Sequence, residues 1–336
     1  MDTRDTAEQA ELRRAARQLA HDLGPATVRD LDDQTRRQRL AGAVRDAGWL
    51  ELRDDAGNGS PLASGVEACI VAEALGAAVA DVPFSGPILA ADLARRAGVT
   101  LVPGAVVAFG ADLVGTGEYP AFAVDAYGDV DAVHVVVRND EQLQVGVTNA
   151  GAIERATDLT RVVRAIPPGS FVADITGHLD ADDVARWTAL GLALTSADLV
   201  GVMRGAIDVT VAYAAERKQY GVAIGSFQAV QHLLAEAAAL CEGAVSVALH
   251  ASWAVDDLAP ADALTAGRVA KAYCARAART VCETAIQVHG GIGNTWDCIA
   301  HVYLRRALLS ARWFGDDAVQ LRALERDLVG VADGFS

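Results

Sequence analysis

Apolar residues at helical spacing and runs of β-prone residues divide the chain into three parts. Apolar positions at helical spacing fill 6–23, 34–47 and 65–80, and after Asp182 the same spacing continues almost to the end. Turn-forming residues interrupt this last part at 218–226, 256–261 and 290–294. The pattern predicts a helical region at each end of the chain. Four long helices with short connections in the second region are typical of an antiparallel bundle.

Four short runs of β-prone residues lie between the helical regions. They occupy 106–109, 121–124, 133–137 and 143–147. Gly, Asp and Asn separate these runs, which predicts a small antiparallel sheet. The fold class is therefore mainly α with a small β-domain. The predicted domains are a helical domain at 1–98, a β-domain at 99–178 and a helical bundle at 179–336.

Composition and charge narrow the function classes. The 336 residues include 44 acidic and 29 basic ones, a formal net charge of −15 that opposes binding to nucleic acid. The N-terminal segment is charged throughout, and no run of 18 apolar residues is free of charge. We therefore expect a cytoplasmic protein that does not bind membranes. The five cysteines are odd in number and widely spaced, which predicts reduced core thiols and no metal site.

The connection between the first two bundle helices is the first segment with candidate chemistry. It reads Glu216-Arg-Lys-Gln-Tyr-Gly-Val-Ala-Ile-Gly-Ser-Phe-Gln228, a helix end, a loop between glycines and the start of the next helix. Ser226 suits the N-cap position, and the free amides of the following turn suit an anion. An ordinary helix connection with a solvated charge cluster would have the same pattern.

Three glycines within four residues mark a second segment, at the end of the third bundle helix. It reads Gln287-Val-His-Gly-Gly-Ile-Gly-Asn-Thr-Trp-Asp297. Glycine lets the backbone approach a phosphate closely, and Gln287 offers donors and an acceptor to a polar heterocycle or a ribityl chain. A glycine C-cap that only ends the helix is the alternative. The segment is neither a P-loop nor a G-x-G-x-x-G after a strand, so the usual nucleotide-binding folds do not apply.

Together, in this order within one bundle, the two segments resemble the C-terminal domain of the acyl-CoA dehydrogenase family. The likeness extends over most of the chain. Further segments that resemble the family are Glu73-Ala-Leu-Gly76, Val82-Pro-Phe84, Asp158-Leu-Thr-Arg161 and Tyr303-Leu-Arg-Arg306. The resemblance implies an N-terminal helical domain, a middle β-domain, here reduced, and a C-terminal four-helix bundle.

The resemblance also implies an FAD-dependent oxidoreductase of lipid metabolism, with the flavin held between subunits. Arg217 would pair with the FAD pyrophosphate, a charge-assisted contact suited to a guanidinium. Phe227 and Gln228 would contact the adenosine half. Gln287, Gly290 and Gly291 would hold the pyrophosphate and adenine side from the neighbouring subunit.

The chain departs from the family at the catalytic base. The family removes an α-proton with a glutamate; its usual position corresponds here to Phe314, and its alternative position on the first bundle helix to about Gly191. Neither residue accepts a proton, so no catalytic residue is predicted. The β-domain also lacks the segments that line the flavin ring in the family. The acids considered as a substitute base are Asp198, Asp316 and Asp317.

These departures favour a half-site subunit of a heteromeric α2β2 acyl-CoA dehydrogenase. It would supply the ADP-side contacts of FAD to a larger partner that carries the catalytic glutamate and the acyl-CoA pocket. The chain is similar to short subunits of actinobacterial steroid-degrading dehydrogenases, which implies a steroid-derived acyl-CoA and an electron-transfer flavoprotein or similar acceptor. The alternatives are a self-sufficient homotetramer with an unrecognised base and a flavin-free scaffold. Retention of Arg217, Gln228 and Gln287 argues against the scaffold.

Overall fold

A computed structural model of the protein describes residues 4–101, 104–109, 121–127, 133–139, 142–148, 151–154, 157–166 and 177–333. The first part is helical: α1 (Ala7–Leu23), η1 (Val28–Asp32), α2 (Gln34–Asp46), η2 (Trp49–Glu51), α3 (Gly65–Ala77) and α4 (Ser85–Ala97). The helices predicted at 6–23, 34–47 and 65–80 are confirmed. Helix α4 was not predicted, because Gly86 and Pro87 in its first turn are residues that usually interrupt a helical pattern.

Side-chain caps explain where several helices begin. Thr6 and Gln9 form a capping box at α1, and Ser64 and Glu67 form another at α3. In each box the polar side chains satisfy backbone amides that the helix itself leaves free. Asp180 does the same for the first helix of the bundle, where it accepts a hydrogen bond from the amide of Asp183 at 2.7 Å.

The described strands form one mixed sheet and one short hairpin. They are β1 (Val106–Phe109), β2 (Ala121–Val124), β3 (Val133–Asn139), β4 (Gln142–Thr148), β5 (Ile153–Glu154), β6 (Val163–Ile166) and β7 (Gly177–Leu179), in the order β5-β6-β2-β1-β3-β4-β7. All four predicted strands are confirmed. The prediction of a purely antiparallel sheet is wrong at one place, because β1 pairs with β3 in parallel.

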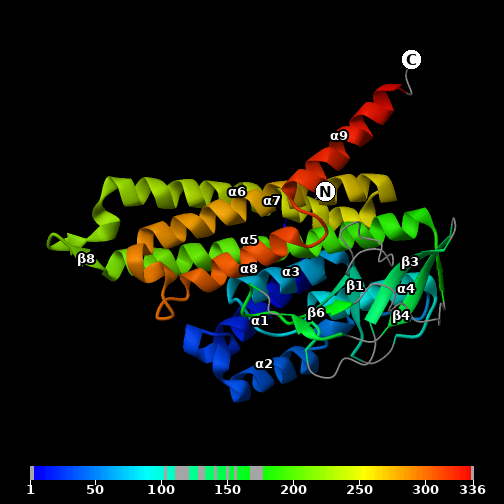
Figure 1. Cartoon of the computed structure of the whole chain (residues 1–336), viewed down its shortest axis with the longest axis horizontal. Coiled ribbons are helices and arrows are strands. Elements are labelled where there is room, and N and C mark those ends of the chain that lie inside the picture. Colours follow the sequence, from blue (N-terminus) through cyan, green and yellow to red (C-terminus); the bar gives the residue numbers. More distant parts are fainter. Residues whose placement is uncertain are drawn as a thin grey trace.

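The last part is a helical bundle along the longest axis of the molecule (Figure 1). It comprises α5 (Ala181–Glu216), β8 (Lys218–Gln219), β9 (Val222–Ala223), η3 (Ile224–Ser226), α6 (Gln228–Asp257), α7 (Pro260–His289), η4 (Gly290–Asn294), α8 (Ala300–Arg312) and α9 (Asp317–Asp333). The fourth predicted helix is in fact two, because the chain turns at Phe314 and Gly315, both of which have positive φ. The domain boundaries at 98/99 and 178/179 stay predictions.

Helix α3 packs closely against α5, and glycines make this approach feasible. A Cβ at Gly201 would lie 2.0 Å from the Glu73 carbonyl oxygen, and a Cβ at Gly76 would lie 2.5 Å from the Asp198 carbonyl oxygen. Both distances are shorter than any real contact. The two helices share the largest core cluster, which also includes Leu75 and Trp187. This core fixes the N-terminal helices on one face of the bundle.

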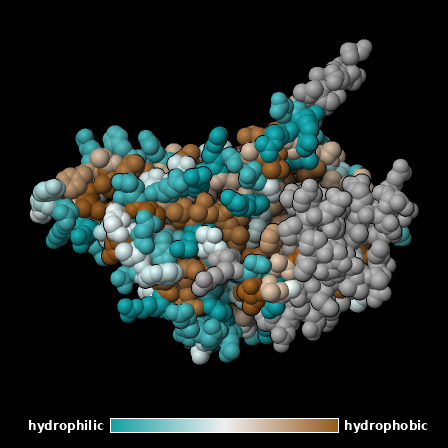
Figure 2. Space-filling view, viewed as in Figure 1, coloured by the Kyte–Doolittle hydropathy of each residue, from teal (hydrophilic) through white to brown (hydrophobic). Residues whose placement is uncertain are grey.

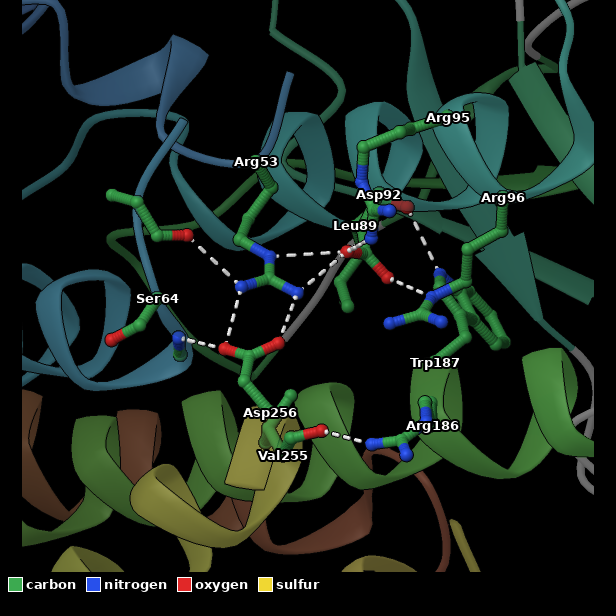
Figure 3. Close-up of polar contacts among 12 residues, drawn as sticks. Arg53, Ser64, Leu89, Asp92, Arg95, Arg96, Arg186, Trp187, Val255 and Asp256 are labelled. Atoms are coloured by element: carbon green, nitrogen blue, oxygen red, sulfur yellow. Dashed lines mark hydrogen bonds and ion pairs between the residues drawn. The ribbon is translucent and has the colours of Figure 1, made fainter. Parts of the chain in front are cut away.

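An ion-pair cluster ties the N-terminal helices to the far end of α6 (Figure 3). The fully buried Arg53 binds Asp92 of α4 at 2.9 and 3.0 Å and Asp256 of α6 at 2.9 and 3.0 Å. The charges of Arg96, Arg53 and Arg95 outweigh burial and lower the pKa of Asp92 to about 2. Each buried charge in this cluster thus has a partner, which buried ions require.

Apolar residues are not confined to the core. Figure 2 shows them along the bundle, between more hydrophilic residues of the outer helices. Among the described residues, two helices, α5 and α6, are long and apolar enough to cross a membrane by length and composition alone. In α5, 89% of that apolar window is buried within the protein, whereas in α6 only 22% is buried. The large apolar side chains of α6 are mostly half-buried in this chain, and the cytoplasmic location stays a prediction.

Candidate functional site

The two glycine-containing segments of the bundle lie at the same end of it. Helix α5 runs into the β8–β9 hairpin there, and α7 ends there in η4 (Figure 1). The rings of Tyr213, near the end of α5, and His289, at the end of α7, stack with centroids 4.4 Å apart. This contact connects the segment that carries Arg217 to the segment that carries Gln287.

A tight hairpin positions Arg217. Lys218 pairs with Ala223 and Gln219 with Val222, and the two residues between the strands, Tyr220 and Gly221, both have positive φ. This is the geometry of a two-residue turn that matches the twist of the strands. The Arg217 carbonyl accepts a hydrogen bond from the Ile224 amide at 2.8 Å. The Arg217 side chain is exposed at the mouth of this hairpin.

The start of α6 differs by one residue from the sequence prediction. Phe227, not Ser226, is the N-cap residue, and no side chain caps the helix. Ser226 belongs to η3, where its hydroxyl donates to the Ala223 carbonyl at 2.6 Å. Gln228 is therefore the first residue of α6, and the amides of this first turn have no side-chain partner of their own in this segment.

The glycine motif leaves open space beside its backbone. A Cβ at Gly290 or Gly291 would meet no atom within 4 Å. Gly290 has a φ of +66°, which explains a glycine there, but packing within the chain gives no reason for Gly291. Gln287, one turn before, is exposed. The segment thus offers an accessible backbone and a polar side chain to a group from outside the chain.

His289 is held by contacts with residues outside the motif. Its Nδ1 donates to the Ala285 carbonyl at 2.8 Å. Burial lowers the pKa of His289, but hydrogen bonds with Cys298 and with the Ala285 carbonyl outweigh burial and raise it. The described residues contain no group of three or more His, Cys, Asp or Glu side chains able to hold a metal ion.

The two residues that the sequence predicts at the family's base positions lie in direct contact. Phe314 is buried, and a Cβ at Gly191 would lie 2.4 Å from Phe314 Cζ. The Phe314 ring also stacks on Phe109 with centroids 4.4 Å apart, and its edge meets Trp187 at 5.9 Å. Trp187 is fixed in turn by a 2.9 Å hydrogen bond from its Nε1 to the Leu89 carbonyl. We call Phe109, Trp187 and Phe314 the aromatic stack.

Sequence reasoning missed the aromatic stack and the lysine that supports it. Lys271 is fully buried, and its Nζ donates to the carbonyls of Ser310 and Trp313 at 2.6 Å and of Ala311 at 3.0 Å. Burial lowers the pKa of Lys271 to about 7. These hydrogen bonds satisfy carbonyl groups at the C-terminal end of α8, and so the lysine fixes the turn that carries Phe314. A lone lysine in an apolar helix was the available signal.

The three acids considered as substitute bases have other roles in the structure. Asp198 is buried and lies 2.6 Å from Arg306, 2.9 Å from Arg161 and 2.7 Å from the Ser310 hydroxyl. Burial alone would raise the pKa of Asp198, but Arg306 and Arg161 lower this pKa to about 2. Asp198 is therefore a poor proton acceptor. Asp316 is exposed and caps α9 through the Val319 amide. Asp317 faces Arg276 at 3.9 Å.

Known proteins are similar to this chain in both sequence and fold. The family profile "Acyl-CoA dehydrogenase, C-terminal domain" matches residues 189–329. Acyl-CoA dehydrogenase IpdE2 of Mycolicibacterium smegmatis is 30% identical over 262 residues, which cover 78% of each chain. Acyl-CoA dehydrogenase FadE34 of Mycobacterium tuberculosis is 39% identical over 157 residues, 46% of this chain and 21% of the relative.

Solved structures superpose on this chain over nearly its whole length. A chain of the ChsE4-ChsE5 complex from Mycobacterium tuberculosis superposes with a TM-score of 0.81 at 26% identity, covering 98% of this chain and 99% of that one. Butyryl-CoA dehydrogenase from Megasphaera elsdenii has the same fold, with a TM-score of 0.79 at 17% identity over 98% and 100% of the two chains.

The chain therefore belongs to the acyl-CoA dehydrogenase family. It is an oxidoreductase of this family, and its cofactor is FAD. The end of the bundle fits the ADP side of that cofactor, since it offers an exposed arginine, an uncapped helix start and glycines with open space. The aromatic stack does not fit a catalytic role of its own, because none of its side chains accepts a proton.

Proposed function

We propose that this chain is the half-site subunit of a heteromeric α2β2 acyl-CoA dehydrogenase. One observation carries the proposal: the Phe314 ring packs against Gly191, so both base positions are occupied by one apolar contact. The candidate FAD contacts are retained at the other end of the bundle. The chain would then lend binding groups to a partner subunit that has the glutamate and the acyl-CoA pocket.

In this proposal the residues of the bundle end hold the ADP part of FAD. Arg217 pairs with the pyrophosphate, Phe227 and Gln228 contact the adenosine, and Gln287 with the adjacent glycines approaches from the second segment. When bound, FAD supplies the hydride acceptor of the reaction. The proposed substrate is a steroid-derived acyl-CoA held by the partner, with an electron-transfer flavoprotein or similar protein as the final acceptor. The similarity to a chain taken from a two-protein complex supports the heteromer.

Arg217→Ala is expected to weaken FAD retention in the assembled complex. A hydrogen bond to a charged group contributes roughly 1.5–3 kcal/mol, about a 10- to 100-fold change in the dissociation constant. The measurement is the ratio of flavin absorbance to protein after gel filtration at low FAD. Arg322→Ala, on the exposed side of α9, is the matched control and should keep its flavin. Unchanged flavin content in Arg217→Ala would refute the pyrophosphate assignment.

Substitutions at the occupied base position are expected to leave turnover nearly intact. Phe314→Leu in the complex should change kcat only a few-fold, because the ring does no chemistry, while the lost packing lowers stability by about 1–3 kcal/mol. Asp316→Ala and Asp317→Ala should behave alike in steady-state kinetics. If kcat fell more than about a hundredfold at either aspartate with flavin still bound, that residue would be a hidden base.

A further inference from the structure

His301, in the first turn of α8, is a buried histidine that is not among the candidate FAD contacts. It is 6% exposed, and neither Nδ1 nor Nε2 makes a hydrogen bond to another residue that the structure describes. Most buried polar groups in proteins have a partner, because burial removes their hydrogen bonds to water. A group from outside the described residues is therefore the expected partner of this imidazole.

The unpaired nitrogens of His301 lie at the N-terminal end of α8. A helical side chain leans toward the N-terminus of its helix, and the His301 ring accordingly contacts Trp296, which precedes α8. The two rings are nearly perpendicular, at 83°, with centroids 5.2 Å apart. The N-cap residue Ile299 makes no side-chain hydrogen bond, and the first turn contains no acidic residue. The Ala300 amide meets the Cys298 sulfur, which is a weak acceptor. This end of α8 therefore suits an anion.

Arg305, one turn further along α8, adds a positive charge. Its guanidinium lies 5.8 Å from the centre of the Trp296 ring, and it donates to the neutral Thr157 carbonyl at 3.2 Å. Burial, and then the charge of Arg305, lower the pKa of His301. The imidazole is therefore neutral near pH 7 and has one N–H to donate. A neutral donor beside an arginine is suited to an anionic oxygen.

The acids closest to this place in the sequence have arginine partners of their own. The Asp297 side chain is 73% exposed and lies 3.9 Å from Arg29. Asp158 is buried, and its carboxylate lies 3.9 Å from Arg161. Within the described ranges, the hydrogen bond of Arg305 goes to a carbonyl and not to a carboxylate. The charge of Arg305 is therefore available to a ligand.

Trp296 adds an aromatic surface to this anion site. It is 63% exposed and follows η4, the helix of the glycine motif, by two residues. Exposed aromatic rings bind nucleobases by stacking, since every base has a π-face. Arginine side chains and helix N-termini bind phosphate. An exposed indole next to an anion site therefore fits a nucleotide, which has both a base and a phosphate.

We propose that Trp296, His301 and Arg305 form a subsite for an adenosine phosphate. The base stacks on the indole, and a phosphate oxygen accepts hydrogen bonds from His301 and Arg305 once the indole has turned away from the imidazole. The nucleotide is either the ADP half of FAD or a free nucleotide such as ADP. In the first case the inference rests on the proposed function, because the subsite then continues the proposed FAD site beyond the glycine motif. In the second case it stands alone.

Retention of FAD in the assembled complex tests the first source. Trp296→Leu and Arg305→Gln should each raise the dissociation constant of FAD at least tenfold, which corresponds to about 1.4 kcal/mol. The measurement is the flavin absorbance that remains after gel filtration at low FAD. Arg312→Gln, at the exposed C-terminal end of the same helix, is the matched control and should keep its flavin. If Arg217→Ala loses flavin while the Trp296 and Arg305 variants keep it, the proposed FAD site stands and this subsite does not bind FAD.

Calorimetric titration of ADP into the FAD-loaded complex tests the second source. A free nucleotide site should bind one ADP per copy of this chain in a saturable manner. Adenosine and inorganic phosphate should bind at least tenfold more weakly, because each lacks one of the two groups that the subsite recognises. Trp296→Leu and Arg305→Gln should weaken ADP binding by the same factor, whereas Arg312→Gln should bind ADP as the wild type does.

His301→Phe separates ligand binding from a structural role. The phenyl ring fills the same place without unpaired nitrogens, so the midpoint of thermal unfolding should stay or rise. Binding of the nucleotide should nevertheless fall at least fivefold. His250→Phe, at an exposed histidine beside Trp253 on α6, is the matched control and should change neither quantity. The proposal is overturned if the Trp296, His301 and Arg305 variants retain FAD as the wild type does and the wild-type complex binds no ADP. It is also overturned if His301→Phe lowers the midpoint and leaves nucleotide binding unchanged.

Discussion

Expressed alone, the chain is expected to show no acyl-CoA dehydrogenase activity, whereas coexpression with its partner should give an active α2β2 complex with about one FAD per αβ pair. In the proposed arrangement each active site is built from two subunits: one contributes the ADP-side contacts of FAD, and the other contributes the catalytic base and the acyl-CoA pocket. In that arrangement this chain would contribute the FAD-binding residues from Arg217 to Gly291, and Phe314 would occupy the position where the partner has its base. A homotetramer would therefore contain no complete site.

Native mass spectrometry, flavin absorbance and the reduction of an artificial electron acceptor test this together. Arg217→Ala in the complex is the control, because it should lower flavin content without changing the subunit ratio. The apolar residues of α6, which this chain leaves only half-buried, should also make the isolated chain prone to aggregation. A stable homotetramer of this chain that carries four FAD and oxidises acyl-CoA unaided would refute the half-site proposal.

Asp198→Asn is expected to destabilise the protein strongly, by about 3–5 kcal/mol, because it leaves the buried Arg306 without a counter-charge, whereas Arg161 keeps its ion pair with Asp125 at 3.0 Å. Arg306 and Arg161 both bind this carboxylate, and Arg306 also donates to the Ala80 carbonyl at 2.8 Å. Removal of Asp198 therefore loosens the contact between α5, α8 and the N-terminal helices. The apparent midpoint of thermal unfolding should fall by several degrees.

The same carboxylate gives a pH dependence with a definite sign. Its pKa is about 2 in the folded protein, below the value of about 3.9 in an unfolded chain. The stabilisation is therefore present above about pH 4 and is lost as the pH falls toward 2, by an amount on the order of 2 kcal/mol. Asp316→Asn, at an exposed cap, should leave both the midpoint and its pH profile unchanged. An Asp198→Asn variant that unfolds like the wild type would show that the cluster contributes little.

Local patterns predicted the elements better than the contacts between them. Runs of β-prone residues predicted the four central strands, and helical spacing of apolar residues predicted most helices, because both patterns are local. The parallel pairing of β1 with β3 was missed, since strand order depends on contacts between distant segments. The break between α8 and α9 was also missed, because Phe314 adopts a positive φ that this residue type seldom has.

The candidate site shows the same division. The sequence predicted that neither base position is acidic, from Phe314 and Gly191 taken one at a time. That the two residues touch, and that Phe109 and Trp187 complete an aromatic stack, depends on how α5, α8 and the sheet pack. The role of Asp198 was equally inaccessible, because its partners Arg161 and Arg306 come from distant parts of the chain. The roles of the residues from Arg217 to Gly291 stay predictions.

The contact between Gly191 and Phe314 constrains how this lineage can change. A side chain at 191 has no room while the ring at 314 is present, so a carboxylate introduced at 191 would clash before it could react. Phe314 must be replaced first, and this substitution weakens the packing of the core without restoring a catalytic base. A carboxylate at position 191 can therefore arise only after Phe314 has been replaced by a smaller residue, and the variant between these two substitutions is less stable. In the proposed heteromer, where the partner supplies the chemistry, the two-subunit arrangement would therefore be hard to reverse.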